Sequence, residues 1–507
     1  MGFMDQVVPG QSMTIGSLVG DEEWTDHAGS FDVVDPGRLS DIVGTVATAS
    51  ASDIDRVVSV AARAQTGWRA QNVAERSALL VRAASELEEN SEQLAILLTR
   101  ENGSVLPISR REILSAAQML RFAADAGLEL LGDGELFTDP ESWVRIRRQP
   151  FGVVGCIVPW NAPVILTAQK IGHALVAGNT VIVKPSPFAP LTVSLILRRL
   201  ASFFPPGVIN VVHGDGDVGS ALVAHRDVRK ISFTGGGATA KLIMRSAADS
   251  LTKIHFELGG NDPAMVLDDA DVEFAADRIT AQAFRRSGQV CFAIKRVYVP
   301  RAMAGDLGEA ILERVGRIAV GHGLDPEATM GPLNNQQQFE KIRGINDRLT
   351  AAGAKITTTG RALHPEEWEN GHYLRPAVVL DADPTDQIVT EEQFGPILPI
   401  VSYDTEDEAV AMANGTEYGL GSSVWSSDPE RAVAFASRIQ AGMTFINEHG
   451  LSALGQKHVP FGGIKQSGMG WENSPSGLAE YLEFHSITFH NVDSHGKVDS
   501  HSADGVK

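Results

Sequence analysis

The chain that follows residue 50 spaces its apolar residues as amphipathic helices do. In "SDIDRVVSVAARA" they fall three or four positions apart, and Ser52 precedes them as the expected N-cap. "SALLVRAASELEEN" continues this spacing, and "EQLAILLTREN" predicts a further helix that Ser91 caps and Gly103 ends. The residues before 50 are extended and rich in turns, with "VVDPGR" as one turn. We therefore expect a mostly helical region behind an extended N-terminal segment.

From Trp143 onward, short apolar runs replace the helical spacing and predict strands. Helical stretches such as "APLTVSLILRRLASF" and "SALVAHRD" lie between several of them, which indicates a parallel sheet covered on both faces. A second alternating region runs from Cys291 to about Phe445, and the tail "LEFHSITFHNV" predicts a final strand. The expected strands before Cys291 are "WVRIRRQ", "GVVGCIV", "TVIVK" (180–184), "GVINVV" (207–212), "KISF" (230–233), "IHFEL" (254–258) and "PAMVL" (263–267).

The length and composition favour a soluble protein of several domains. At 507 residues the chain is too long for one hydrophobic core, so two or three domains are expected. It is 43% hydrophobic and 21% charged, as ordinary globular proteins are. Its net charge of −20 opposes binding to nucleic acid or to an anionic membrane surface, because both need clustered lysine and arginine. We expect neither as a partner.

The number of cysteines and the N-terminal sequence indicate the expected cellular compartment of the protein. Two cysteines cannot build a disulfide framework for a chain of this size, which favours a reducing compartment. The N-terminal "MGFMDQVVPGQSMTIGS" has no cationic segment followed by an apolar core, so we expect no signal peptide. The most apolar long stretch, "FGVVGCIVPWNAPVILTA", is interrupted by Gly, Pro and Asn, whereas a membrane span needs ~20 mostly apolar residues. A cytoplasmic location is expected.

One of the two cysteines, Cys291, stands in cationic surroundings. In "RRSGQVCFAIKR" four cationic residues lie within six positions of it: Arg285, Arg286, Lys295 and Arg296. A free cysteine has a pKa of about 8.5, and nearby positive charge raises its thiolate fraction at neutral pH. The alternatives are a buried inert thiol, and cations that are solvated or paired with acids. The other cysteine, Cys156, lies in the apolar run "GVVGCIV", and we expect it in the core.

Two glycine-rich junctions are candidate phosphate sites. "GDGDVG" (214–219) matches G-x-G-x-x-G between a strand and a helix, but Asp215 and Asp217 would set negative charges beside a diphosphate. We therefore favour a tight turn there over a phosphate cradle. "ISFTGGGATAKL" offers Gly235, Gly236 and Gly237 at a helix N-terminus with no acid nearby. The alternative at this second junction is a simple glycine-rich turn.

Five short motifs follow one another along the chain: "PWNAP" (159–163), "FELGGN" (256–261), "GQVC" (288–291), "EEQFGP" (391–396) and "PFGGIKQSGMG" (460–470). In this order and spacing they resemble the aldehyde dehydrogenase superfamily, from about residue 20 to 490. The resemblance implies an α/β fold with a doubly wound cofactor domain, an α/β catalytic domain and a β oligomerisation arm. The implied division is 1–127 and 148–256 for the NAD(P)-binding domain, 257–447 for the catalytic domain, 128–147 and 481–495 for the arm, 448–480 for a return to the cofactor domain with an active-site loop, and 496–507 for a disordered tail.

The resemblance also assigns chemical roles. Hydride transfer from an aldehyde requires a tetrahedral centre, which a thiolate adduct supplies, and Cys291 matches the family's nucleophile. The oxyanion would be bound by the side chain of Asn161 and the backbone N–H of Cys291. Glu257 matches the general base that activates water for thioester hydrolysis, and Lys170 is included among the catalytic residues. Relatives that pass the acyl group to coenzyme A generally lack the base, so Glu257 favours the hydrolytic branch, whose product is a free carboxylic acid.

An NAD or NADP site is implied as well. Lys184 in "VKPSP" resembles the lysine on the adenosine ribose, Glu392 the carboxylate on the nicotinamide ribose, and Phe394 the aromatic residue beside the nicotinamide. Two positions depart from the pattern: Pro187 stands where NAD-preferring members often have Glu, and Gly236 where Ser is frequent. Without that Glu a 2′-phosphate meets no repulsion, so NAD is expected and NADP stays open. The remaining implied cofactor contacts are Ile157, Pro159, Trp160, Ser186, Gly216, Phe233, Thr234, Gly235 and Leu258.

Substrate contacts are expected from Ala162, Phe284, Arg285 and Phe292. Ala162 stands where many relatives place Phe, which favours a roomier tunnel. Arg285 matches a position where succinate semialdehyde dehydrogenases keep an arginine for the substrate carboxylate, and a guanidinium suits a carboxylate well. Gln169 occupies the position of their second arginine, so an internal ion pair of Arg285 stays an alternative. The expected substrate is an aldehyde, with a carboxylated semialdehyde as the alternative.

Other classes of function fit the motifs less well. A catalytically dead binding protein of this fold is opposed by the presence of Cys291, Glu257 and Asn161. A reductive enzyme for a phosphorylated semialdehyde is opposed by Glu257 and by the "PWN" pattern. No His or Cys cluster has ligand spacing, so we expect no metal. In the family the tail strand adds to a neighbouring subunit's sheet, so a homodimer or homotetramer is expected.

Overall fold

The computed structural model describes residues 12–25, 28–132, 134–139 and 142–490. The tail expected to be disordered, 496–507, lies outside the described residues. The extended N-terminal segment forms a small sheet of β1 (Met13–Ile15), β5 (Arg38–Ala47) and β4 (Ser30–Asp35), in that order. The predicted turn in "VVDPGR" is confirmed, because β4 ends at Asp35 and β5 begins three residues later. Among the described residues no helix has the length and apolar character needed to cross a membrane.

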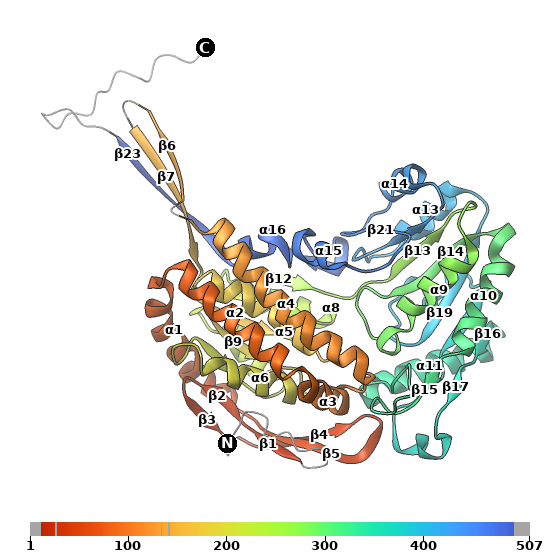
Figure 1. The fold of residues 1–507 in the computed structure, drawn as a ribbon, viewed down its shortest axis with the longest axis horizontal. Coiled ribbons are helices and arrows are strands. Elements are labelled where there is room, and N and C mark those ends of the chain that lie inside the picture. The colour runs from red at the N-terminus through yellow and green to blue at the C-terminus, as the bar shows by residue number, and fades with distance from the viewer. Residues whose placement is uncertain (1–11, 26–27, 133, 140–141, 491–507) are drawn as a thin grey trace, which may run out of the picture.

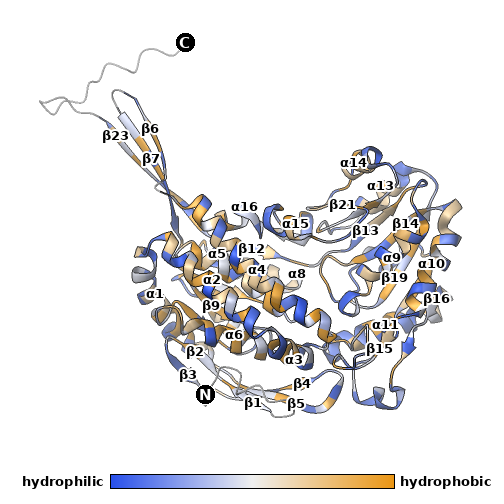
Figure 2. Ribbon diagram, in the orientation of Figure 1, coloured by the Kyte–Doolittle hydropathy of each residue, from blue (hydrophilic) through white to orange (hydrophobic). Residues whose placement is uncertain are grey.

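The region predicted to be helical consists of four helices, of which the last and longest was not predicted. The four are α1 (Ile54–Ala70), α2 (Val73–Glu89), α3 (Ser91–Asn102) and α4 (Leu106–Leu130). Apolar residues at helical spacing pack these helices into the core, and Figure 2 colours them by hydropathy; α3 and α4 also bury charged residues, among them Glu101 and Glu112.

Both predicted N-caps of these helices were wrong by one or two positions. A 3₁₀ turn precedes α1, and Ser50 rather than Ser52 opens it, with the Ser50 N–H donating to Asp53 at 2.7 Å. Asn90 caps α3, and Ser91 is already its first helical residue. Helical backbone therefore begins before the first polar residue that the pattern indicated. Gly103 is confirmed as the C-cap of α3, with a left-handed φ of 87°.

An eight-stranded sheet forms the first α/β layer, and all its predicted strands are present (Figure 1). The strands run in the order β22-β12-β11-β8-β9-β10-β2-β3. The five in the middle are parallel, whereas β2 pairs with β10 and β22 with β12 in antiparallel fashion. Their bounds are β8 (Val153–Ile157), β9 (Thr180–Lys184), β10 (Ile209–Val211), β11 (Val228–Thr234), β12 (Lys253–Glu257), β2 (Ser17–Val19), β3 (Glu22–Trp24) and β22 (Gly468–Met469).

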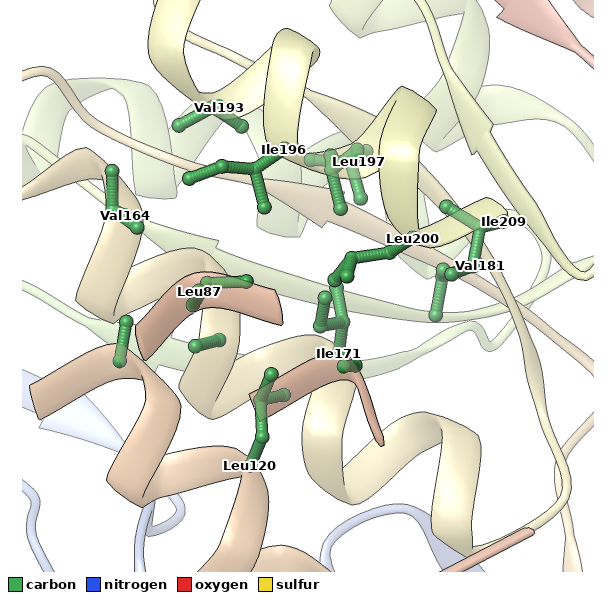
Figure 3. Close-up of a cluster of buried hydrophobic side chains, with 14 of the residues drawn as sticks. Leu87, Leu120, Val164, Ile171, Val181, Val193, Ile196, Leu197, Leu200 and Ile209 are labelled. Carbon is green, nitrogen blue, oxygen red and sulfur yellow. The ribbon is translucent and has the colours of Figure 1, made fainter. Parts of the chain in front are cut away.

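Helices cover this sheet and supply its largest core. The crossover helices are α5 (Pro163–Val176), α6 (Leu191–Ala201), α7 (Gly216–Ala224) and α8 (Gly237–Ala248). Each fully buried aliphatic side chain in such a core contributes about 1.5–3 kcal/mol to stability. Figure 3 shows side chains of α2, α4, α5 and α6 meeting those of β9 and β10: Leu87, Leu120, Val164, Ile171, Val193, Ile196, Leu197, Leu200, Val181 and Ile209.

The second α/β layer follows residue 261 and holds a seven-stranded sheet in the order β16-β18-β19-β14-β13-β20-β21. All of its pairings are parallel except β16 with β18. The strands are β13 (Asp262–Val266), β14 (Ile294–Pro300), β16 (Lys355–Thr358), β18 (Ala377–Leu380), β19 (Ile397–Tyr403), β20 (Ser423–Trp425) and β21 (Phe445–Ile446). The longer helices that accompany them are α9 (Val272–Ala283), α10 (Ala304–Gly316), α11 (Gln336–Ala351), α13 (Glu406–Asn414) and α14 (Pro429–Ala436).

A three-stranded antiparallel arm projects from the first layer (Figure 1). Its strands are β6 (Glu135–Thr138), β7 (Ser142–Pro150) and β23 (Leu482–His490), with β7 in the middle. The expectation of strands from residue 128 was wrong at its start, because α4 runs to Leu130. Phe484 of β23 is 71% exposed and Phe137 of β6 is 54% exposed. The arm therefore presents apolar surface outside either core.

Candidate active site

The first sheet gathers the predicted site residues along one edge. The chain passes from β8 to β9 and β10 on one side, then to β11 and β12 on the other, so the strand order reverses between β8 and β11. In open α/β sheets ligands bind outside the carboxyl ends of the strands at such a switch point. Lys184, Thr234 and Glu257 end β9, β11 and β12, and Trp160 and Asn161 follow β8.

Cys291 faces a cavity of about 400 Å³ between the two layers. Cys291 lies in the loop just before β14, so it belongs to the second layer, and its thiol lies toward the edge of the first sheet. Of the predicted residues, Asn161, Ala162, Arg285 and Phe292 line the same cavity. Phe284 does not, because it is 4% exposed within the core of the second layer. The polar side chains that also line this cavity include Gln169 and Glu448.

The turn that precedes Cys291 has an unusual backbone. Arg286 and Ser287 have φ of 52° and 57°, in the left-handed region that non-glycine residues rarely adopt. Arg286 is held there by an ion pair with Glu112 and by donation to the Asn161 carbonyl at 3.1 Å. Asn161 in turn donates its Nδ2 to the Gln289 carbonyl at 3.0 Å. These contacts tie the loop after β8 to the segment that carries the thiol.

Most of the cations near Cys291 in sequence have other partners. Arg286 pairs with Glu112, and Arg296 donates to the carbonyls of Asn261 and Ala413 at 2.8 Å each. Lys295 donates to the carbonyl of Cys291 itself at 2.8 Å. The charge expected to favour a thiolate is therefore largely neutralised elsewhere, as the alternative interpretation held.

Burial dominates the chemistry of both thiols. It raises the pKa of Cys291 to about 12, against the lowering effect of Lys295 and together with the raising effects of Glu257 and Glu392. The sequence left open whether the cations near Cys291 act on its sulfur; in the structure desolvation outweighs Lys295, the cation that lowers this pKa. Cys156 is confirmed as a core residue at 0% exposure, and burial raises its pKa to about 12 as well.

Glu257 is a buried carboxyl group at the end of β12. It is 2% exposed, and neither carboxylate oxygen has a hydrogen-bond partner among the described residues. Burial raises its pKa well above the usual range, and the nearby Glu472 raises it further while Lys170 lowers it. A carboxyl group of this kind holds a proton more readily than an exposed one and is suited to general acid–base work near neutral pH.

Lys170 lies in α5 and forms an ion pair with Glu472, and both side chains are at most 1% exposed. Both members of this ion pair are close enough to Glu257 to affect its pKa: Glu472 raises it and Lys170 lowers it. The sequence analysis missed Glu472. Its signal was an acid in "GMGWENS" directly after the last motif, but 215 residues separate it from Glu257 and nothing local shows that they meet.

The predicted cofactor residues form a surface that fits a dinucleotide. Helix α8 begins at Gly237 with Gly236 as N-cap, no side chain caps it, and a Cβ at either glycine would meet open space. Backbone N–H groups at such a helix end attract phosphate. Thr234 Oγ1 is buried without a hydrogen-bond partner among the described residues. Lys184 is 7% exposed, and its burial lowers its pKa to about 8.

The remaining predicted cofactor contacts lie around this surface. Glu392 is bound by Lys295 at 3.2 Å and by the Gly260 N–H at 3.2 Å, and a Cβ at Gly259 would come 2.1 Å from its Oε2. Phe394 stands edge-on to Trp160, with ring centroids 5.6 Å apart. Gly216 begins α7, where the Asp215 side chain caps the helix as the tight-turn interpretation predicts. The others lie on or next to strand ends: Ile157, Pro159, Ser186, Phe233, Gly235 and Leu258.

Arg285 brings a cation to the substrate side of the cavity. Its guanidinium lies over the Phe292 ring, 5.5 Å from the centroid, and its Nε is buried without a hydrogen-bond partner among the described residues. Burial and Arg286 lower its pKa to about 10, so it remains a cation at neutral pH. No ion pair of Arg285 occurs within the described residues, whereas Glu448 pairs with Arg278 at 3.5 Å. The cavity therefore holds a positive charge without an internal partner.

Comparison with known proteins agrees with this geometry. A sequence profile of the aldehyde dehydrogenase family matches residues 24–487. A protein from Burkholderia cenocepacia superposes with a TM-score of 0.90 at 35% sequence identity, over 96% of this chain and 99% of that one. Betaine aldehyde dehydrogenase from Staphylococcus aureus, solved with NAD⁺, does so with a TM-score of 0.88 at 32% identity, over 93% and 94%. A 3,6-anhydro-L-galactose dehydrogenase solved with NADP has a TM-score of 0.88 at 31% identity, over 94% and 99%.

The chain belongs to the aldehyde dehydrogenase family, and its activity class is aldehyde oxidation. The predicted α/β architecture is confirmed with it.

Proposed function

We propose that the protein oxidises an aldehyde to the free carboxylic acid with NAD(P)⁺ through a covalent adduct on Cys291. The observation that carries this proposal is that the Cys291 thiol and the Asn161 amide line one cavity, while the buried carboxyl group of Glu257 ends a strand of the neighbouring sheet, close enough to raise the pKa of Cys291. Both carboxylate oxygens of Glu257 are buried without a hydrogen-bond partner among the described residues, so the mechanism requires this side chain to turn toward the cavity to meet water.

In this mechanism Cys291 loses its proton to a base and its sulfur bonds to the aldehyde carbon. Asn161 Nδ2 and the Cys291 backbone N–H donate to the resulting oxyanion, which stabilises charge where it develops. Bound NAD(P)⁺ supplies the acceptor for the hydride that leaves this carbon. Glu257 then takes a proton from water, the hydroxide adds to the thioester carbon, and the C–S bond breaks to release the acid and the Cys291 sulfur.

The cofactor would be held by residues of the first sheet. The uncapped N-terminus of α8 at Gly236 and Gly237 suits the diphosphate, Lys184 the adenosine ribose, and Glu392 the nicotinamide ribose. We favour NAD and keep NADP, because Pro187 removes the repulsion that a Glu would offer to a 2′-phosphate. Solved relatives carry either cofactor.

A narrower substrate class is favoured by Arg285. Arg285 lines the cavity with a cation that has no ion-pair partner among the described residues, and its buried Nε has no hydrogen-bond partner there, so an anionic group of a ligand would be favourable beside it. A carboxylate at the far end of a short aldehyde would satisfy it while the carbonyl carbon reaches Cys291. We therefore infer that the substrate is a carboxylated semialdehyde such as succinic semialdehyde. Ala162 in the same wall leaves space for it.

The test is reduced-cofactor formation with NAD⁺ and with NADP⁺, comparing succinic semialdehyde with butanal. The proposal expects turnover that Cys291→Ala abolishes, and a kcat/KM preference of at least tenfold for the carboxylated substrate. In Glu257→Gln one equivalent of reduced cofactor per site should form without further turnover, because the thioester accumulates. Full turnover in Cys291→Ala or in Glu257→Gln would overturn the mechanism, and a preference for butanal would overturn the substrate class alone.

We further propose a homo-oligomer assembled through the arm and a cytoplasmic location. The outer edge of β23 pairs with no strand within the described chain, and exposed Phe484 lies on it. Both cysteines are free, as in reducing compartments. Light scattering at micromolar concentration should give at least twice the mass of one chain, and a monomer would contradict the arm's proposed role.

A further inference from the structure

A hydrogen-bonded network of buried polar side chains, Tyr481, Ser232 and His255, lies next to Glu257. Ser232 of β11 and His255 of β12 are paired in the parallel register. His255 is two residues before Glu257, so both side chains leave the same face of β12. Ser232 and His255 are each 0% exposed, and Tyr481, the residue before β23, is 1% exposed.

The contacts in this hydrogen-bonded network are compatible with a neutral His255 ring that carries its hydrogen on Nε2, which is the tautomer that can donate toward Glu257. Tyr481 donates its hydroxyl to Ser232 Oγ at 3.0 Å, and Ser232 Oγ lies 3.1 Å from His255 Nδ1. Because the serine oxygen accepts from Tyr481, its own proton is free to go to Nδ1. The neutral ring then carries its hydrogen on Nε2. That nitrogen lies 3.5 Å from Glu257 Oε1, and neither atom has a hydrogen-bond partner among the described residues.

We propose that His255 is a positioning residue for the general base: the chain Tyr481–Ser232–His255 aims its last N–H at Glu257 and stabilises the carboxylate form. The inference rests on the proposed hydrolytic function, because it assigns a partner to the base of that reaction. At 3.5 Å the last contact is longer than an ordinary N–H···O hydrogen bond, so the two atoms must approach by roughly 0.5 Å for Nε2–H to donate to the carboxylate. Each donor in such a chain polarises the next.

The charged groups around the chain keep His255 a neutral donor. Burial lowers its pKa well below the usual value, and three cationic or titratable neighbours from other elements lower it further: Lys170, Lys230 and His173. Glu472 Oε1 is 3.9 Å from Nδ1. Around Glu257 itself, Lys170 favours the carboxylate, while Glu472 and Glu480 disfavour it. Burial, Glu472 and Glu480 thus raise the Glu257 pKa. In the proposal the His255 N–H lowers it, as Lys170 does.

Removing the His255 donor should move the acidic limb of the pH–rate profile to higher pH. A general base works above its pKa, so the acidic limb of the rate profile lies at the Glu257 pKa. An N–H donor to the carboxylate lowers that pKa, and removing the donor moves the limb to higher pH. A substitution that only damages the fold would instead lower the rate at every pH.

The experiment measures kcat for aldehyde oxidation and for 4-nitrophenyl acetate hydrolysis from pH 5.5 to 9.5 in the full-length enzyme. In His255→Phe, which keeps a ring and removes the donor, the acidic limb should move up by about one pH unit, or about tenfold in rate below it. The rate at pH 9.5 and KM should stay within about twofold. His255→Gln, which restores an N–H donor, should recover most of the shift.

Two further sets of variants sharpen the test. Tyr481→Phe and Ser232→Ala remove donors earlier in the chain and should move the limb in the same direction by less. His213 is the matched control, because it is equally buried at 1% and its Nε2 likewise lies near a serine, Ser194 Oγ, at 3.2 Å. His213→Phe should leave the limb of ester hydrolysis where it is.

The outcomes separate the two proposals. If Cys291→Ala and Glu257→Gln lose turnover while the His255→Phe profile overlays that of the wild type, the role of His255 is overturned and the hydrolytic function stands. If Glu257→Gln keeps full hydrolysis, the proposed function itself fails. Should His255→Phe not fold by circular dichroism, Ser232→Ala and Tyr481→Phe decide: unmoved limbs in both overturn the proposal, and upward shifts in both support it.

Discussion

The two thiols of this protein stand in regions that titrate alike and are built differently. Burial raises the pKa of each to about 12. Cys156 lies within β8, between neighbouring strands on both sides and against the core of the first layer. Cys291 lies in a loop with a cavity of about 400 Å³ before it and Lys295, Glu257 and Glu392 around it. If Cys291 is the nucleophile, as proposed, then access to a cavity and nearby charged groups distinguish it from Cys156, rather than the number of cations close in sequence.

The largest difference should appear in catalysis. Cys291→Ala is expected to lower aldehyde turnover by at least about 10⁴-fold, because the covalent route is lost. Cys156→Ala is expected to keep kcat within about twofold. Steady-state assays with the preferred aldehyde measure both. If Cys291→Ala kept its turnover, or if a folded Cys156→Ala lost it, the two thiols would not differ in catalysis as proposed.

Alkylation should separate the thiols by access and by pH. A thiol with a pKa near 12 is protonated below that pH, so its thiolate fraction rises about tenfold per pH unit. The rate of Cys291 modification by iodoacetamide should therefore rise about 10²-fold from pH 7 to 9, while Cys156 stays unmodified in the folded protein. Mass spectrometry of peptides gives both rates. A Cys291 rate that is already flat above pH 7 would mean that the sulfur ionises at neutral pH after all.

A smaller effect should follow from the cation that only the Cys291 region has. Arg285→Met keeps much of the side-chain volume and removes the charge, so kcat/KM for succinic semialdehyde should fall roughly 10–100-fold while that for butanal changes less than about threefold. Arg278→Met is the matched control, since Arg278 is exposed and pairs with Glu448. Equal losses for both aldehydes would return Arg285 to a structural role.

The smallest expected effect concerns stability. Cys156→Ala removes a sulfur from a closely packed strand and should lower the free energy of unfolding by about 1–2 kcal/mol. Cys291→Ala should cost less than about 0.5 kcal/mol, because its site already borders a cavity. Urea unfolding of the two variants checks the ranking. A larger loss in Cys291→Ala would show that its loop contributes to the core.

The sequence predicted the layers better than the ends of the elements. Short apolar runs identified the five parallel strands of the first sheet, which are mostly buried, but not its antiparallel strands β2, β3 and β22. The observed caps, Ser50 and Asn90, were not predicted, because helical backbone begins before the apolar pattern does. The 25-residue α4 was not predicted, although it lines the cavity and supplies Glu112 to Arg286.

In the candidate site, too, some residues were predicted from the sequence and others were not. Cys291, Asn161 and Glu257 were identified through motifs, whereas the partners that decide their ionisation come from distant segments. Glu472, for example, acts on Glu257 across 215 residues of chain. The direction of the Cys291 pKa could not be predicted, because desolvation depends on what covers a group in space.

The root of the arm has a mechanical consequence. The Tyr481 carbonyl accepts a hydrogen bond from Asn179 at 3.0 Å, and the buried Tyr481 hydroxyl is bonded to Ser232, so this residue is clamped at both ends. One residue later β23 begins and its side chains become exposed. Tyr481 therefore anchors the start of the projecting strand to the buried part of the first sheet through both its backbone and its side chain.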